Sequence, residues 1–257
     1  MIALLGGGQL GRMFLENALR FGARVHVMDP DPQAPCAALA DRFVTGDLTD
    51  PDAVVQFAAD ADVVGIEIEQ VSAAALEQLK RRGKRVIPDP DVLRTIQDKG
   101  LQKQFYQDHG IPTAPFALVN ATEEVKTHPE LLPAFLKTRT GGYDGKGVMA
   151  VTSATTTGLF EGPCVLEQQV EIALELAVIV VRGSDGTETS YDPVEMVFDP
   201  VLNLVDHLQA PARIDDATAK EARTLAMRVA DAFAAPGIYA VEMFLDKQGR
   251  LLVNETA

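Results

Sequence analysis

Residues 135–151, Phe-Leu-Lys-Thr-Arg-Thr-Gly-Gly-Tyr-Asp-Gly-Lys-Gly-Val-Met-Ala-Val, hold a glycine-rich turn around which the chain is best interpreted. Apolar residues on both sides predict a strand, a turn and a strand, and the glycines supply the positive φ of a tight connection. Glycine N–H groups that turn inward bind phosphate oxygens, and Lys137 and Lys146 add positive charge nearby. No Ser or Thr follows Gly-Lys and no helical pattern follows the turn, which excludes a P-loop. A plain glycine-rich hairpin is the alternative interpretation.

The composition indicates a globular chain of 257 residues, long enough for two or three packed units. A formal net charge of -14 argues against nucleic acid or an anionic membrane as the main partner. Cys36 and Cys164 are too few for a disulfide framework or a thiolate metal site, which is typical of a reducing cytoplasm. Glycines break the first apolar run, so it is neither a signal sequence nor a membrane span. We expect a soluble cytoplasmic protein with small-molecule partners.

The N-terminal stretch Gly6-Gly-Gly-Gln-Leu-Gly11 follows a short apolar strand and precedes a helical pattern. A second strand ends in Asp29, close to where a dinucleotide-binding fold places its ribose-binding acid. NAD is therefore a first hypothesis for the ligand. A glycine turn at a helix N-terminus also suits any phosphate, including that of a mononucleotide.

Strands and helices continue to alternate as far as residue 87, which predicts a parallel sheet covered on both faces. Glu67 and Glu69 follow the strand at 63–66, where open α/β sheets bind ligands, although an exposed strand end is the alternative. A helical stretch then runs from 88 to about His109, with Lys99 and Lys103 on one face. Residues 110–115 read as a linker between two domains.

The rest of the chain predicts an α+β unit, with a helix from 122 to about 132, another at 217–233 and a final hairpin of strands 238–245 and 250–255. A turn centred on residues 247 and 248 pairs Glu242 with Val253 and makes Glu255 a diagonal neighbour, about 7–8 Å away. One hard cation could bridge these two carboxylates. A solvent-exposed edge is the alternative. Asn254 would point the other way in an ideal strand, so any role for it needs a local twist.

Several motifs together resemble the ATP-grasp superfamily and, within it, the family of 5-(carboxyamino)imidazole ribonucleotide synthetases of bacterial purine synthesis. They are Gly6–Met13, Gln97–Lys103, Thr140–Gly147, the spacing of Glu167 and Glu175, and Glu242 with Asn254-Glu255. The resemblance implies an α/β fold with a Rossmann-like pre-ATP-grasp domain at 1–97 and an α+β ATP-grasp domain at 98–257. The latter would comprise a small lid unit at about 113–170 and a larger unit at about 171–257.

The same resemblance implies carboxylation of 5-aminoimidazole ribonucleotide by ATP and bicarbonate, through carboxyphosphate, in a homodimeric enzyme that uses Mg²⁺. Contacts to ATP are implied for Lys99, Lys137, Gly142, Tyr143, Asp144, Gly145, Lys146, Gly147, Val148, Glu167, Gln168, Gln169, Val170, Glu175, Asn254 and Glu255. Glu167 to Val170 would hold adenine largely through the backbone, and Glu175 would take the ribose hydroxyls. The ribonucleotide would be bordered by Gln9, Leu10, Glu69, Tyr143, Asp144 and Lys146, of which the last three are the implied catalytic residues. Glu242 and Glu255 would ligate the metal.

Two departures from the family pattern stand out. Phe198 takes the place of a His that many members carry, and the chain stops at Ala257, where the family continues into a basic loop and a further small domain. We therefore expect either a longer native chain or a fragment that binds Mg²⁺-ATP without carboxylation. The alternatives are a formate-dependent glycinamide ribonucleotide transformylase, a non-catalytic nucleotide-binding module and, as an outsider, an NAD-dependent oxidoreductase.

Overall fold

The computed structural model describes residues 1–142, 147–154, 158, 160–198 and 204–257. The chain divides into two compact units, Met1–Gln97 and Asp98–Ala257, and each is considered by itself. Within the described ranges, no helix is both long and apolar enough to span a bilayer.

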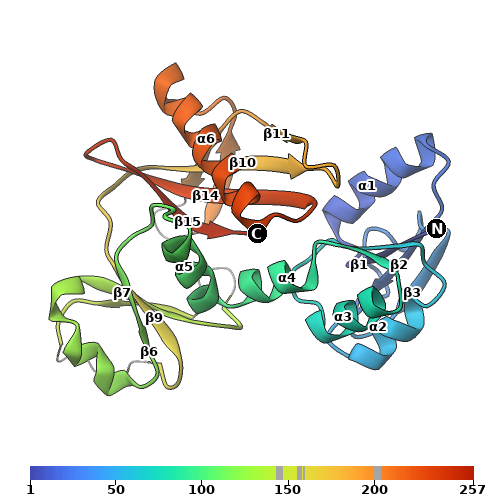
Figure 1. Ribbon diagram of the computed structural model, residues 1–257, viewed down its shortest axis with the longest axis horizontal. Helices are drawn as coiled ribbons and strands as arrows, with labels where there is room; N and C mark the ends of the chain where they lie inside the picture. Colours follow the sequence, from blue (N-terminus) through green and yellow to red (C-terminus); the bar gives the residue numbers. More distant parts are fainter. Residues whose placement is uncertain (143–146, 155–157, 159, 199–203) are drawn as a thin grey trace. The chain divides into compact units, whose positions relative to one another are not determined.

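The N-terminal unit is built on a five-stranded, all-parallel sheet in the order β3-β2-β1-β4-β5 (Figure 1). Its strands are β1 (Ile2–Leu5), β2 (Val25–Asp29), β3 (Arg42–Thr45), β4 (Val63–Ile66) and β5 (Arg85–Ile87), and its helices are α1 (Gln9–Arg20), α2 (Pro51–Phe57), α3 (Ala73–Arg81) and α4 (Pro90–Gln97). Side chains of the central strand alternate between two cores: Ala3 and Leu5 join the one formed with α2 and α3, whereas Leu4 joins the one formed with α1. The prediction of a parallel sheet covered on both faces is confirmed.

The second unit begins with α5 (Lys99–Asp108). One continuous helix was predicted from 88 to about 109, and this is wrong, because Asp98 has extended backbone angles and starts a new helix as its N-cap. Its carboxylate accepts hydrogen bonds from the Gly100 N–H at 2.8 Å and the Leu101 N–H at 3.1 Å. This cap fixes where α5 begins.

A four-stranded antiparallel sheet follows, in the order β6-β9-β7-β8. Its strands are β6 (Phe116–Val119), β7 (Ala134–Thr138), β8 (Val148–Val151) and β9 (Cys164–Gln168). The helix expected at 122–132 is instead two short 3-10 segments, Thr122–Thr127 and Pro129–Leu131. Pro129 explains the difference, since it lacks an N–H donor and disfavours helical angles at the preceding residue. Strands β7 and β8 confirm the predicted strand–turn–strand around the glycine-rich segment.

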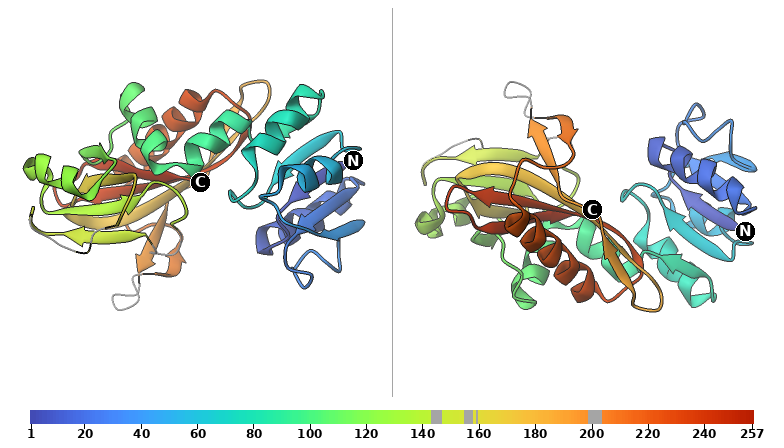
Figure 2. Two further views of the ribbon diagram at one scale, coloured as in Figure 1. Left: turned by 90° about the horizontal axis from the view of Figure 1, so that it is seen from below. Right: turned by 90° about the horizontal axis from the view of Figure 1, so that it is seen from above.

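The larger sheet of this unit has the order β13-β12-β10-β14-β15, with β11 paired to β10. Its strands are β10 (Ile172–Arg182), β11 (Glu188–Ser190), β12 (Val194–Phe198), β13 (Val205–Gln209), β14 (Gly237–Asp246) and β15 (Leu251–Thr256). Helix α6 (Asp216–Phe233) packs against β10, β11 and β14, and runs beside them in both views of Figure 2. The second unit is thus the α+β arrangement that the sequence predicted.

Candidate active site

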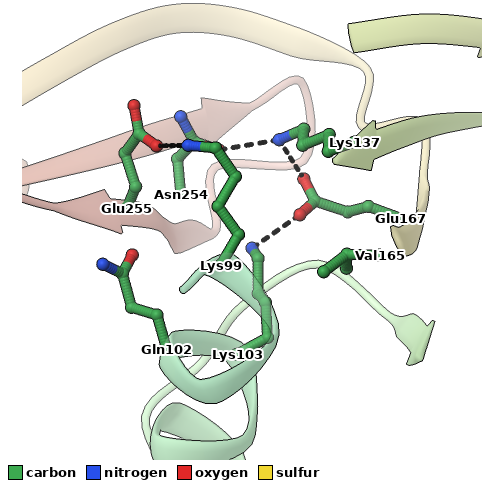
Figure 3. A pocket seen from close by; sticks show the side chains of 8 residues that line it. All are labelled: Lys99, Gln102, Lys103, Lys137, Val165, Glu167, Asn254 and Glu255. Carbon is green, nitrogen blue, oxygen red and sulfur yellow. Dashed lines mark hydrogen bonds and ion pairs between the residues drawn. The ribbon is translucent and has the colours of Figure 1, made fainter. Parts of the chain in front are cut away.

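A cavity in the second unit collects charged side chains from four elements that are distant in sequence (Figure 3). Helix α5, strands β7 and β9 and strand β15 contribute its lining, which consists of Lys99, Gln102, Lys103, Lys137, Val165, Glu167, Asn254 and Glu255. Five of these residues were predicted to contact ATP, namely Lys99, Lys137, Glu167, Asn254 and Glu255. The cavity therefore brings together residues up to 156 positions apart.

Helix α5 is fixed against β15 by buried hydrogen bonds. The side-chain amide of Gln102 donates to the Thr256 carbonyl at 2.9 Å and accepts from the Thr256 N–H at 3.0 Å, and Tyr106 donates to Gln102 at 2.9 Å. Lys99, one turn before Lys103, pairs with the carboxylate of Glu255. The spacing of the two lysines was a signal in the sequence, but it did not indicate what they would contact.

Glu167 lies at the centre of a buried charge network. Its Oε2 is 2.7 Å from the Lys103 ammonium, and its Oε1 accepts from Lys137 at 3.1 Å. The Lys103 contact is an ion pair without hydrogen-bond geometry, so Oε2 has no hydrogen-bond partner among the described residues. Burial alone would raise the pKa of Glu167, but Lys103 and then Lys137 hold that pKa below its usual range. Lys137 also donates to the Asn254 Oδ1 at 3.2 Å.

The last hairpin differs from its predicted register. Leu245 pairs with Leu251 and Met243 with Val253, and a β-bulge then places Glu255 directly opposite Glu242. Asn254 is the extra residue of the bulge, which bends the strand and changes the direction of its side chain. The prediction that Glu242 faces Val253 is therefore wrong. The bulge supplies the local irregularity that a role for Asn254 was expected to need.

Three carboxylates near this bulge differ in how they are compensated. Burial, and then Glu255 and Glu175, raise the pKa of Glu242 to about 7. Burial also raises the pKa of Glu175 on β10 to about 6. Glu255 is only partly buried, and Lys99 and then Lys137 lower its pKa. A buried, poorly compensated carboxylate opposite another is a donor set that suits a hard cation, although the described residues contain no cluster of three or more potential metal ligands.

The structure describes the two ends of the glycine-rich turn, up to Gly142 and from Gly147 onward. Gly141 and Gly147 adopt φ of 75° and 77°, and the Gly147 carbonyl accepts from the Thr138 N–H at 2.9 Å. Gly142 and the exposed Val148 flank the segment. Tyr143, Asp144, Gly145 and Lys146, which carry the predicted catalytic roles, lie outside the described residues.

The stretch predicted to hold adenine leaves β9 and continues past it. The Gln168 N–H donates to the Pro115 carbonyl at 2.8 Å, and the Gln169 N–H donates to the Pro133 carbonyl at 2.9 Å. The Val170 carbonyl accepts from the Ile172 N–H at 3.0 Å. Two backbone N–H groups of the predicted adenine segment are therefore already used within the protein.

The glycine turn of the N-terminal unit is occupied by carboxylates. Asp29 accepts from the Gly7 N–H at 2.7 Å, and Glu67 accepts from the Gly8 and Gly11 N–H groups at 3.3 and 3.4 Å. Gln9 and Leu10 are exposed at the start of α1, whereas the exposed Glu69 makes its side-chain hydrogen bond with neighbouring Gln70. Glu67, rather than Glu69, is the acid that accepts hydrogen bonds from the glycine turn. Asp29 also accepts a hydrogen bond from this turn, so its carboxylate is already engaged where an NAD ribose would need it.

Phe198, which replaces the expected His, ends β12 and is half-buried. Glu195, three positions before Phe198, was not predicted to have a structural role. Glu195 is 2% exposed and accepts from the Arg213 Nε at 2.8 Å. That ion pair keeps the pKa of Glu195 below its usual value.

Comparison with known protein families matches each unit separately. The ribonucleotide synthetase preATP-grasp domain matches residues 1–97, and the ATP-grasp domain matches residues 104–257. Together, these domains define an ATP-grasp protein with a pre-ATP-grasp domain before it.

Individual relatives show to which family of ATP-grasp proteins the chain belongs. The chain is 35% identical over its whole length to the N5-carboxyaminoimidazole ribonucleotide synthase of Bacillus subtilis, of which it covers 69%, and 37% identical to the phosphoribosylaminoimidazole carboxylase of Ogataea methanolica, of which it covers 49%. The crystal structure of an Aspergillus clavatus N5-carboxyaminoimidazole synthase with ADP and 5-aminoimidazole ribonucleotide superposes with a TM-score of 0.88 at 34% identity, over the whole chain and 69% of that structure. The chain belongs to the N5-carboxyaminoimidazole ribonucleotide synthase family.

Proposed function

We propose that the whole protein to which this chain belongs carries out the ATP- and bicarbonate-dependent carboxylation of 5-aminoimidazole ribonucleotide, as an ADP-forming carbon–nitrogen ligase. The observation that carries the proposal is the convergence of Lys99, Lys137, Asn254 and Glu255 in one cavity. Relatives with this name and an ADP- and ribonucleotide-bound structure support the choice of substrates. The chain spans about half to 70% of the relatives described above, so the activity of the whole protein is part of the proposal.

In this reaction a bicarbonate oxygen attacks the γ-phosphorus of ATP, and the bond to the β,γ-bridging oxygen breaks to release ADP. The carboxyphosphate formed then delivers carbon dioxide to the exocyclic amine of the ribonucleotide and releases phosphate, and the amine loses its proton. Lys99 and Lys137 are assigned to the phosphates, because their ammonium groups lie in the cavity and neutralise charge that moves toward the leaving ADP. Glu175 is assigned to the ribose hydroxyls and residues 167–170 to adenine.

The paired carboxylates of Glu242 and Glu255 would hold Mg²⁺, which would supply charge neutralisation between phosphate oxygens. The fit rests on the bulge that sets Glu242 opposite Glu255, and on the raised pKa of Glu242, which partial burial and the neighbouring Glu255 cause. Lys99 pairs with Glu255 in this structure, so this lysine lies beside the proposed metal site as well as in the cavity assigned to the phosphates.

The remaining assignments are also proposals. Tyr143, Asp144 and Lys146 would act at the ribonucleotide as catalytic residues, with Gln9, Leu10 and Glu69 bordering it. The ATP-grasp domain would divide into a lid at about 113–170 and a larger unit at about 171–257. We place the protein in the cytoplasm as a homodimer. Exposed apolar side chains of α1, including Met13 and Phe14, offer a surface for the second copy, and sedimentation equilibrium tests this.

ADP release with Mg²⁺-ATP is the direct test of the proposed reaction. Bicarbonate together with 5-aminoimidazole ribonucleotide should stimulate release, because the acyl phosphate needs both an oxygen nucleophile and an acceptor amine. Formate together with glycinamide ribonucleotide should not stimulate it. Stimulation by the formate pair alone would assign the chain to the transformylase alternative, and an absence of stimulation by either pair would overturn the proposed function.

A further inference from the structure

The three lysines of the cavity differ in their access to a ligand. Side-chain exposure rises from 5% for Lys103 to 16% for Lys137 and 27% for Lys99. Figure 3 shows Lys103 rising from α5 toward one oxygen of Glu167, while Lys137 approaches the other oxygen from β7. Lys103 is therefore placed to act on Glu167 and is too deeply buried to compete for a phosphate.

Positive charges outnumber negative ones in the group formed by Lys103, Lys137 and Glu167. Two lysines share the single carboxylate of Glu167, which is 3% exposed. With Lys137 alone, Glu167 would form a neutral pair and cancel the charge of that lysine. With Lys103 present, the three side chains have two ammonium groups for one carboxylate, and Lys137 is the more exposed of the two lysines. Such charges interact strongly because water is largely excluded.

A second contact of Lys103 fixes the other wall of the cavity. Its ammonium donates to the Thr113 Oγ1 at 2.7 Å, and that hydroxyl donates to the Val253 carbonyl at 2.6 Å. Val253 immediately precedes Asn254, whose side chain accepts from Lys137. The Lys137 ammonium contacts Glu167 and Asn254. Lys103 contacts Glu167 directly, and it is linked to the strand that carries Asn254 through Thr113.

We propose that Lys103 is a positioning residue for nucleotide triphosphate: it provides the counter-charge to Glu167 that leaves Lys137 positively charged and aimed at the phosphates. The inference rests on the proposed function, because it takes the polyphosphate of ATP as the ligand of Lys137. It assigns Glu167 a side-chain role at the phosphate end, separate from any backbone contact with adenine.

The test is calorimetric binding of adenosine and of the non-hydrolysable analogue AMPPNP with Mg²⁺ to the whole chain. In Lys103→Met the affinity for AMPPNP should fall by about tenfold or more, the usual effect of losing a charge-assisted interaction, while adenosine affinity stays within about twofold. Lys103→Arg, which keeps the charge, should retain most of the preference for AMPPNP. Lys103→Gln keeps hydrogen-bonding capacity without charge, and it should show the same selective loss if Lys103→Met does not fold.

A double-mutant cycle with Lys137 separates positioning from simple structural support. If Lys103 acts through Lys137, then adding Lys103→Met to Lys137→Met should weaken AMPPNP binding by no more than about twofold further. Tyr106→Phe is the matched control, because it removes buried hydrogen bonds from α5 to Gln102 and Thr256 without touching Glu167. It should lower the melting temperature and leave the preference for AMPPNP over adenosine unchanged.

Three results would overturn the proposal: an unchanged AMPPNP affinity in Lys103→Met, a proportional loss of adenosine and AMPPNP binding, or additive losses in the double mutant. Equal wild-type affinity for adenosine and AMPPNP would overturn it as well, since no polyphosphate contact would exist. Failure of the proposed reaction has a different signature. Nucleotide binding and the Lys103 effect would persist, while bicarbonate and the ribonucleotide would not stimulate ADP release.

Discussion

At the scale of single residues, neighbouring charges determine the pKa values of four buried or partly buried glutamates in the second unit. Glu167 and Glu255 have lowered pKa values because lysines from α5 and β7 outweigh their burial. Glu242 and Glu175 have raised pKa values because burial dominates and, for Glu242, the nearest groups are also acidic. Glutamates of one unit therefore differ in pKa according to whether a lysine lies beside them.

The paired carboxylates lead to a prediction about metal dependence. Glu242→Gln and Glu255→Gln should each raise the Mg²⁺ concentration required for half-maximal nucleotide binding, because each removes one charged oxygen donor from a shared site. Titrations of Mg²⁺ at fixed nucleotide concentration measure this effect. Glu221→Gln, on the exposed side of α6, is the control and should behave as wild type. A response from only one of the two variants would show that the carboxylates do not share a cation.

At the scale of elements, two local irregularities shape the site. The bulge in β15 turns Asn254 toward Lys137 and sets Glu255 opposite Glu242. The positive φ of Gly141 and Gly147 shapes the two ends of the glycine-rich segment between β7 and β8. Both features depart from a regular antiparallel ladder, and both lie beside predicted nucleotide contacts.

Gly147 should tolerate substitution less well than Gly141, although their φ angles are nearly equal. A left-handed conformation costs an alanine about 1–2 kcal/mol at either position. A Cβ at Gly147 would also collide with the Thr138 Oγ1, whereas a Cβ at Gly141 meets no atom of the described residues within 4 Å. Gly147→Ala should therefore lower the free energy of unfolding by more than Gly141→Ala does, as measured by urea denaturation.

Thr138→Ala offers a check on the cause of that difference. It removes the colliding hydroxyl, so in the Gly147→Ala background it should recover part of the lost stability. Equal costs for the two glycine variants, or no recovery in the double variant, would contradict the crowding argument.

At the scale of the whole molecule, the two units have separate cores and separate glycine turns. In the N-terminal unit, Asp29 and Glu67 already accept hydrogen bonds from the turn. In the second unit, lysines line the cavity despite a net charge of -14 over the chain. Local side chains, rather than the total charge, therefore decide where an anion binds.

Hydrogen exchange with mass spectrometry should show which of the two units each ligand protects. Mg²⁺-ATP should protect amides of β7, β9 and β15, because a bound ligand suppresses local opening of the elements that hold it. NAD should protect neither these strands nor residues 6–11, since Asp29 and Glu67 occupy the N-terminal turn. Protection of residues 6–11 by NAD would contradict this assignment of the two units.

Local patterns were enough to predict the parallel sheet, the strand–turn–strand and the α+β second unit, because alternation and glycine content act over a few residues. They failed at Asp98 and Pro129, where a cap and a proline divided the expected helices. The site was predictable only in part: the motifs marked Lys99, Lys137, Glu242 and Glu255 as candidates. The spacing of Lys99 and Lys103 indicated a shared helix face, but it did not indicate that Lys103 is buried or that Gln102 lines the cavity, since burial depends on what packs above them.

Residue types and short-range order followed from the amino-acid sequence, including the fold class and the lysines and acids available for a nucleotide. Contacts between residues distant in sequence were decided by tertiary packing. Lys103, Glu167 and Lys137 meet because α5, β9 and β7 pack around one point, and Asn254 joins them because a single bulge shifts the register of β15. Coulombic energy depends on separation and on water exclusion, and both are set by the folded chain rather than by spacing along it.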